Sequence, residues 1–467
     1  MAGLSGLKGI PPLVKFLPLR SILYWVLLPA LLLGLSSPAR AYSVLSHEEV
    51  VDQAWLKYLL PLLQQRYPGL TPDQIRECHA YAYGGSVIQD IGYYPFGDKE
   101  FSDLLHYVRS GNFVTALLRD ADTPDEYAFA LGALAHYYGD TVGHPTVNIV
   151  TGEEYPHLRS RFGRIVTYGD NETAHLRTEF GFDVVEVAHG AYSQQNYRDF
   201  IGFQVSKDVL ARAFLQTYGL PIDDVLTHED LAISTYRYSV STLIPKMTKV
   251  ALAGYGKQIQ HANPSFAKKK FIYRMRRTQF EQEYGHHYAR ESFGDRFVAF
   301  LIAILPKVGP LSGLRLHLPD GDQQTQFLAS FDHVEDAYRN QIKLIAAAPA
   351  VDPPTLPELD FDTGKPTQEG EYPLADKSYA WLTEHLAADD KAQISPSLLA
   401  DLDRYYQNPQ AQDVLKTKPA DWAKLQTALA RVRNASIAPQ GLRNSPVTHA
   451  TDALHQTGPA VAFTPVE

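Results

Sequence analysis

An apolar stretch of the chain, residues 128–145, contains three residues that could do chemistry. His136 and Asp140 are four residues apart and His144 follows after the same interval, so in a helix the three share one face. Burying an imidazole and a carboxylate among apolar side chains is unfavourable, and a divalent cation would compensate for both. The alternative is a His–Asp pair hydrogen-bonded inside the core, and these three residues alone do not separate the two interpretations.

A second pair with the same spacing favours the metal interpretation. His175 and Glu179 repeat the interval on a second predicted helix. Taken along the chain, the candidate metal ligands are His47, Asp90, His106, His136, Asp140, His144, His175 and Glu179. Imidazoles and carboxylates are donors that Zn²⁺ accepts, and this set exceeds what one tetrahedral ion needs, which indicates two or three ions sharing a bridging carboxylate. A di-iron bundle fits less well, because it uses Glu-x-x-His pairs.

The central pair must be carried by a long helix. Thr123 supplies an N-cap, Pro124 the first helical residue and Glu126 the acid of a capping box, so a helix is predicted to begin at Pro124. Small and large apolar residues alternate all round this helix, which predicts that it packs on most of its sides. Pro145 predicts that the helix ends near His144.

Other helices are predicted to carry the remaining ligands. A capping box of Ser46 and Glu49 predicts a helix that begins at His47, and Thr71-Pro72 predicts a second that runs toward Gly84-Gly85. A short helix is expected over 101–108, carrying His106. Glycines and a proline predict an irregular loop between Val150 and Tyr168. No alternation typical of strands occurs in residues 42–260, so this region is predicted to be all-α.

The first 41 residues read as a secretory signal peptide. Lys8, Lys15 and Arg20 precede an apolar run, and Ala39-Arg40-Ala41 provides small residues at the cleavage positions. Cleavage is predicted after Ala41, which would make the mature protein secreted or periplasmic. The segment holds four basic residues and no acid, so its removal takes the formal charge from -9 to -13. A chain this acidic is not expected to have a stable nucleic-acid partner held by basic surface.

The C-terminal part carries no recognisable motif. A helical extension is predicted over 266–347, followed by a Pro-rich segment, 348–375, that is either a linker or an extended segment wrapped on the protein. A small helical segment is predicted over 376–435, with helices at 379–387, 395–406 and 422–432. The tail, 436–467, is predicted to be disordered. Cys78 is the single cysteine, so no internal disulfide is available.

The order and spacing of the candidate ligands resemble the bacterial zinc-dependent phospholipases C, which share one all-α superfamily with fungal-type zinc single-strand nucleases. The matching motifs are His47 near the mature N-terminus, the segment Gly84 to Asp90, His106, His136-x-x-x-Asp140-x-x-x-His144, and His175-x-x-x-Glu179. They cover about residues 42–185, with weaker similarity to about 260. The resemblance implies a multi-helix phospholipase C/nuclease-type bundle around a metal cluster, with a catalytic domain over 42–265 and a helical C-terminal extension.

The resemblance also implies three zinc ions. The first ion would be held by His106, His136 and Asp140, with or without Asp90. The second would be held by His144, His175 and Glu179. The third would be held by His47 and by the amine and carbonyl of the N-terminal residue Tyr42, with Asp140 as the bridging carboxylate. The free amine exists only after cleavage of the signal peptide. Asp90 would orient or deprotonate the attacking water.

Two features depart from the family pattern, and two others resemble different members of the superfamily. The interval from Asp140 to His144 is shorter than in the bacterial phospholipases and the nucleases, and is similar to the catalytic domain of glycosylphosphatidylinositol-specific phospholipase D. Tyr42 stands where the family usually has Trp. The step from Tyr42 to His47 is similar to the nucleases, whereas Glu179 is similar to the phospholipases.

Acidity, the absence of disulfides and Glu179 favour a lipid substrate. The expected function is that of an exported zinc-dependent phosphoric diester hydrolase with phospholipase C-type cleavage of a phospholipid and contact with a membrane surface. Two alternatives are a zinc-dependent single-strand nuclease, which a basic aromatic groove near the metals would favour, and a non-catalytic surface or binding protein that zinc stabilises.

Overall fold

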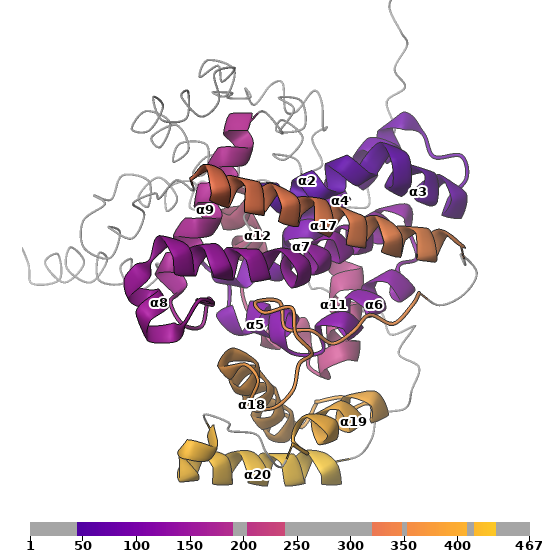
Figure 1. Ribbon diagram of the computed structural model, residues 1–467. Helices are drawn as coiled ribbons and strands as arrows, with labels where there is room; N and C mark the ends of the chain where they lie inside the picture. Colours follow the sequence, from indigo (N-terminus) through magenta and orange to yellow (C-terminus); the bar gives the residue numbers. More distant parts are fainter. Residues whose placement is uncertain (1–43, 190–202, 239–319, 348–352, 409–414, 436–467) are drawn as a thin grey trace, which may run out of the picture. The chain divides into compact units, whose positions relative to one another are not determined.

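The computed structural model describes residues 44–189, 203–238, 320–347, 353–408 and 415–435 of the 467-residue chain (Figure 1). Every named element within these ranges is helical, and the single contact of β type is an isolated antiparallel bridge between Leu359 and Pro366. The prediction of an all-α fold is therefore confirmed. Among these residues no helix combines the length and apolar character needed to cross a membrane.

The helices of the N-terminal part are α2 (Val44–Ala54), the π-helical turn η1 (Trp55–Leu59), α3 (Leu60–Arg66), α4 (Pro72–Val87), the 3₁₀ turn η2 (Ile88–Tyr93), α5 (Lys99–Tyr107), α6 (Ser110–Asp120), α7 (Pro124–Glu154), α8 (Pro156–Phe162), α9 (Glu172–His189), α11 (Lys207–Tyr218), η4 (Ile222–Asp224) and α12 (Glu229–Tyr238). Those that follow are α17 (Gly321–Ala347), α18 (Pro373–Ala388), α19 (Pro396–Tyr405), η7 (Leu415–Thr417) and α20 (Pro419–Asn434).

Helix α7 begins at Pro124 as predicted, with the capping box formed by Thr123 and Glu126. It packs closely against α4, because glycines replace side chains where the two backbones meet. A Cβ atom on Gly132 of α7 would lie 1.9 Å from the carbonyl oxygen of Ala82 in α4. Helix α17 lies along α7 in Figure 1, and the Tyr338 hydroxyl donates a 2.9 Å hydrogen bond to the carbonyl of Leu131.

The prediction that α7 ends near Pro145 is wrong, since the helix continues to Glu154 with Pro145 inside it. A proline in a helix leaves the carbonyl four residues earlier without its N–H partner, and here that carbonyl belongs to Thr141. Gly364, from a segment far along the chain, approaches this oxygen so closely that a Cβ atom there would lie 2.2 Å away. The carbonyl that the proline leaves without a helical partner is thus covered by a distant segment of the chain.

Two other local predictions are wrong. Helix α2 begins at Val44 rather than at His47, and the Ser46 hydroxyl donates to Asp183 at 3.2 Å instead of capping the helix. The expected loop between Val150 and Tyr168 contains the end of α7 and the helix α8. In the first case a contact with a distant segment outweighs the local signal.

The C-terminal helices α18, α19 and α20 correspond to the three predicted after the Pro-rich segment. Residues 353–372, which precede α18, have no helix and lie against α6 and α7. The division of the chain into domains stays a prediction. The signal peptide, Tyr42, most of the extension 266–347 and the tail 436–467 lie outside the described residues.

Candidate metal centre

Eight predicted ligands, drawn from five elements, come together in the structure. They are His47 of α2, Asp90 of η2, His106 of α5, His136, Asp140 and His144 of α7, and His175 and Glu179 of α9. None of these eight is more than 3% exposed. They form three groups, His47–His136–Asp140, Asp90–His106–His136 and His144–His175–Glu179, and within each group the ligand atoms lie within 4.8 Å of one another.

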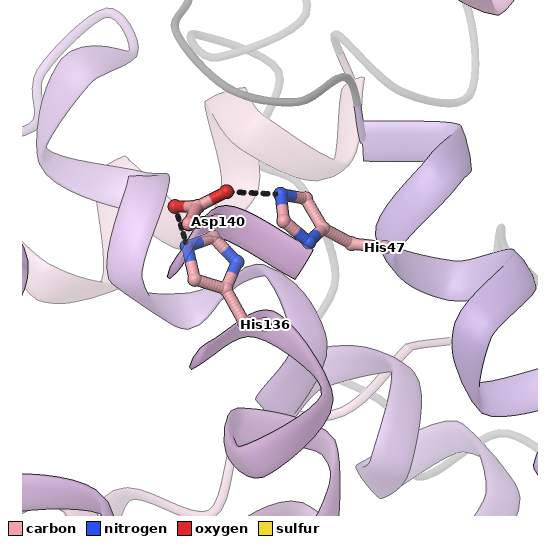
Figure 2. Close-up of side chains that lie close together, drawn as sticks. All are labelled: His47, His136 and Asp140. Atoms are coloured by element: carbon pink, nitrogen blue, oxygen red, sulfur yellow. Dashed lines mark ion pairs between the residues drawn. The ribbon is translucent and has the colours of Figure 1, made fainter. Parts of the chain in front are cut away.

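Asp140 lies between the histidines and presents its two oxygens to different partners. Oδ1 lies 3.3 Å from His47 Nε2 and 3.2 Å from His144 Nε2. Oδ2 lies 3.0 Å from His136 Nε2 and 3.4 Å from His106 Nε2. Figure 2 shows His47 and His136 approaching Asp140 in this way. A carboxylate placed so can bridge two cations.

The group that includes α9 also places one carboxylate oxygen close to two histidine nitrogens. His175 Nε2 lies 2.7 Å from Glu179 Oε1, and His144 Nε2 lies 3.3 Å from the same oxygen. His144 therefore stands between Asp140 and Glu179, and it connects this group to the central carboxylate.

Asp90, in the turn η2, belongs to the group with His106 and His136. Its Oδ1 lies 3.3 Å from His106 Nε2 and 4.0 Å from His136 Nε2. The adjacent Gln89 side chain donates a 3.0 Å hydrogen bond to the carbonyl of Ala133, which holds the turn against α7.

The arrangement of these residues suits zinc coordination better than it suits a hydrogen-bonded His–Asp pair inside the core. Zn–N and Zn–O bonds of about 2.0–2.1 Å in a tetrahedron place ligand atoms roughly 3.3 Å apart. Most of the distances around Asp140 have this value. Both oxygens of Asp90 and of Asp140, and Nε2 of His136, are buried without a hydrogen bond within the described part of the chain. A buried polar atom without a hydrogen bond is costly in a core, and a cation bound here would offset that cost.

The outward-facing ring nitrogens are fixed by backbone carbonyls. His106 Nδ1 donates to Ser102 O at 2.8 Å, and His136 Nδ1 donates to Ser86 O at 2.8 Å. His144 Nδ1 donates to Phe361 O at 3.0 Å. A carbonyl can only accept, so the proton lies on Nδ1 and Nε2 is left to bind a metal.

Without metal, the charges of the site shift the pKa values strongly. Burial alone lowers the pKa of His106, but Asp140 and Asp90 raise it to about 9. Burial likewise lowers the pKa of His144, and Asp140 and Glu179 raise it to about 10. The neighbouring histidines hold the pKa of Asp140 well below its ordinary value despite the burial of that carboxyl.

Some residues of the centre were not predicted from the sequence. Asp183 lies one turn beyond Glu179 and accepts the hydrogen bond from Ser46, and the repeated interval of four residues on α9 could have indicated it. Glu48, the residue after His47 in the sequence, is also fully buried, although it belongs to none of the three ligand groups. Phe361 and Asp362 contact His144 from the Pro-rich segment, and no local signal marks them.

The comparisons with known proteins agree with this arrangement. Residues 46–227 match the model of the family described as zinc dependent phospholipase C. Neither the search of curated proteins nor the search of solved structures found a match. The matched range contains all eight clustered histidines and acids, and the helical fold is the one that the resemblance implied. The match therefore supports the zinc-dependent phospholipase C family for residues 46–227 of this chain.

Proposed function

We propose that the protein is an exported, zinc-dependent phosphodiester hydrolase that cleaves phospholipids by a phospholipase C-type reaction. The observation that carries the proposal is the position of Asp140, whose two buried oxygens face two different pairs of histidines within the family-matched range. A centre that only stabilised the fold would need one tetrahedral set of ligands, whereas three adjoining groups suit a multinuclear hydrolytic site.

Zinc in this centre would neutralise charge on the phosphodiester and acidify water at the site. Eight buried residues would hold it: His47, Asp90, His106, His136, Asp140, His144, His175 and Glu179. Asp90 is suited to take the proton of the attacking water, because both of its oxygens are buried without a hydrogen bond among the described residues. The carbonyls behind His106 and His136 keep those rings oriented during the reaction.

The lipid substrate and the export of the protein are part of the same proposal. The family match and the acidic net charge of the chain support a phospholipid, with contact to a membrane surface, over a polyanionic nucleic acid. We propose that the signal peptide is removed after Ala41. Intact-mass analysis of the exported protein tests this directly, and a mass that retains the first 41 residues would overturn it.

The activity is tested on the mature chain that begins at Tyr42. Zinc-loaded protein is incubated with phosphatidylcholine vesicles and, separately, with single-stranded DNA. We expect release of diacylglycerol, its loss in Asp90→Asn, and retention in Glu153→Gln, which changes an acid of α7 away from the metal groups. Cleavage of DNA with no diacylglycerol would establish the nuclease alternative, and zinc binding without hydrolysis of either would establish the non-catalytic one.

The proposed role of the N-terminal amine needs a separate measurement. Elemental analysis of the mature protein is expected to give about three zinc ions per chain. A form with one additional residue before Tyr42 should retain about two, because its amine is displaced from the site. Equal zinc content in the two forms would contradict the role of the amine.

A further inference from the structure

Residues 353–372, called here the strap, contact the metal centre although they lie outside the family-matched range 46–227. The strap is attached first to α6. The two carboxylate oxygens of Glu358 accept hydrogen bonds of 3.1 and 3.0 Å from the backbone N–H groups of Gly111 and Asn112. The Ser110 hydroxyl donates a 2.6 Å hydrogen bond to the carbonyl of Leu359. The two bonds to Glu358 cap the first turn of α6, and together with the Ser110 bond they fix where the strap begins to cross the protein.

A tight turn then brings the strap onto α7. The N–H of Gly364 donates to the carbonyl of Asp360 at 2.9 Å, and Gly364 has a φ of +67°. A Cβ atom at this position would lie 2.2 Å from the carbonyl oxygen of Thr141, which Pro145 leaves without a helical N–H partner. Because Thr141 lies between two candidate ligands of α7, the turn is seated directly behind the metal centre.

Phe361, within this turn, contacts three of the histidines. Its N–H donates to the carbonyl of His106 at 3.1 Å, and its own carbonyl accepts from His144 Nδ1 at 3.0 Å. Its buried ring lies with its centroid 5.0 Å from that of His106 and 5.9 Å from that of His136. The strap therefore supplies for His144 what Ser102 and Ser86 supply for the other two rings.

Asp362 adds a buried carboxylate on the same side of His144. Its Oδ1 lies 3.7 Å from His144 Nδ1, and its Oδ2 accepts hydrogen bonds from the hydroxyls of Tyr107, at 3.0 Å, and Tyr372. Its backbone carbonyl accepts a 2.6 Å bond from the Asn148 side chain. The carboxylate is thus held in place from several directions, and it is 3% exposed.

We propose that Phe361 and Asp362 of the strap serve the metal centre as positioning residues that orient His144 and increase its basicity as a zinc ligand. A carbonyl or carboxylate behind a ligating imidazole fixes its tautomer and strengthens its metal bond, and loss of such a group typically weakens metal binding about 10–100-fold. The inference rests on the proposed zinc centre. It concerns the affinity of the His144–His175–Glu179 group and does not depend on which substrate is cleaved.

The test uses the mature full-length chain and two variants of the strap. Asp362→Asn removes the charge behind His144 with little change of shape. Gly364→Ala forces the turn away from α7. The control is Asp360→Asn, which neutralises a buried carboxylate of the same turn that bonds to Thr363 and not to a metal-site residue. Zinc dissociation constants are measured by competition with a chromogenic chelator, and Co²⁺-loaded protein is examined by visible absorption.

We expect one class of zinc sites to weaken about 10-fold or more in Asp362→Asn and Gly364→Ala, and to keep its affinity in Asp360→Asn. The Co²⁺ absorption bands should change in Asp362→Asn and not in the control. Melting temperatures in excess chelator identify any variant whose metal-free fold is destabilised. If Gly364→Ala does not fold, the inference is tested with Asp362→Asn alone.

Wild-type zinc affinity in Asp362→Asn, or an equal loss in Asp360→Asn, would overturn the inference. Failure of the proposed function gives a different result, because the protein would then bind zinc with the predicted dependence on Asp362 and hydrolyse no phospholipid. A wild-type chain that binds no zinc would refute both.

Discussion

Asp140 is the residue on which the centre depends most. It lies within 3.4 Å of four histidine nitrogens, and both of its oxygens are buried. A carboxylate shared among so many ligands allows cations to lie close together, because its charge offsets their repulsion. An amide at this position keeps the shape but supplies no charge.

Asp140→Asn is therefore expected to lose at least one zinc ion per chain and to reduce hydrolysis more than about 100-fold, since even loss of a group behind a ligand costs 10–100-fold. Elemental analysis and the phospholipid assay measure the two effects. Glu153→Gln, on the same helix, serves as the control. Full zinc content in Asp140→Asn would show that this carboxylate is not a bridging ligand.

Protonation of the histidines opposes metal binding. In the metal-free protein the pKa of His106 is about 9 and that of His144 about 10. Both rings are therefore protonated on both nitrogens, and positively charged, at neutral pH. Zinc binding at pH 7 should therefore release about two protons from these residues. Calorimetric titrations in buffers of different ionisation enthalpy measure the number, and release of none would contradict the assignment of both rings as ligands.

The same shifts fix the pH dependence of the metal-free fold. The folded-state values lie above the ordinary histidine value of about 6.5, so these groups bind protons more tightly in the folded state. Their stabilisation is complete below about pH 6.5 and is lost as pH rises through about 9 and 10. Denaturant unfolding of chelator-treated protein should show stability falling across this range, and a rise would contradict the prediction.

The contact between helices α4 and α7 determines whether the candidate metal ligands come together. The glycines at their contact allow the backbones to approach, and Gly132 is one turn before His136 on α7. A Cβ atom at Gly132 would lie 1.9 Å from the Ala82 carbonyl oxygen, so the two helices would have to separate. Because α7 carries three ligands and α4 leads directly into the turn with Asp90, separation would enlarge the centre.

Gly132→Ala is expected to lower the free energy of unfolding by about 1–3 kcal/mol, or more if the helices cannot adjust, and to weaken zinc binding. Denaturant unfolding and chelator competition measure the two effects. Gly321→Ala is the matched control, because a Cβ atom at the start of α17 meets nothing within 4 Å. Equal effects of the two substitutions would show that the α4–α7 contact does not control the centre.

At the scale of the whole molecule, zinc and fold should stabilise one another. The centre joins helices from across the range 44–189 with the strap, and without metal it holds several buried carboxylates close together. Zinc at about 1,000 times its dissociation constant adds roughly 4 kcal/mol of stability per site.

Chelation should accordingly lower the melting temperature by roughly 10 °C or more. Thermal unfolding with and without chelator measures the change, and added zinc should restore the original value where added magnesium does not. An unchanged melting temperature would indicate that the centre does not bind zinc in the folded protein.

Much of this molecule follows from its sequence because the signals are local. The capping box before Pro124, the intervals within α7 and α9, and the absence of strand alternation all act within a few turns of helix. They predicted an all-α fold, the start of the central helix and eight residues that the structure brings together. The family resemblance followed from the same intervals, and the match over residues 46–227 confirms it.

What only the tertiary structure decided depends on contacts between distant segments. Helix α7 continues through Pro145, and Gly364, more than two hundred residues later, packs against the carbonyl that the proline leaves without a helical N–H partner. The Pro-rich composition of 353–372 is compatible with a free linker, and nothing nearby marks Phe361 or Asp362 as neighbours of His144. Intervals along a helix determine which residues share a face, whereas the approach of a distant segment is determined by packing of the whole chain.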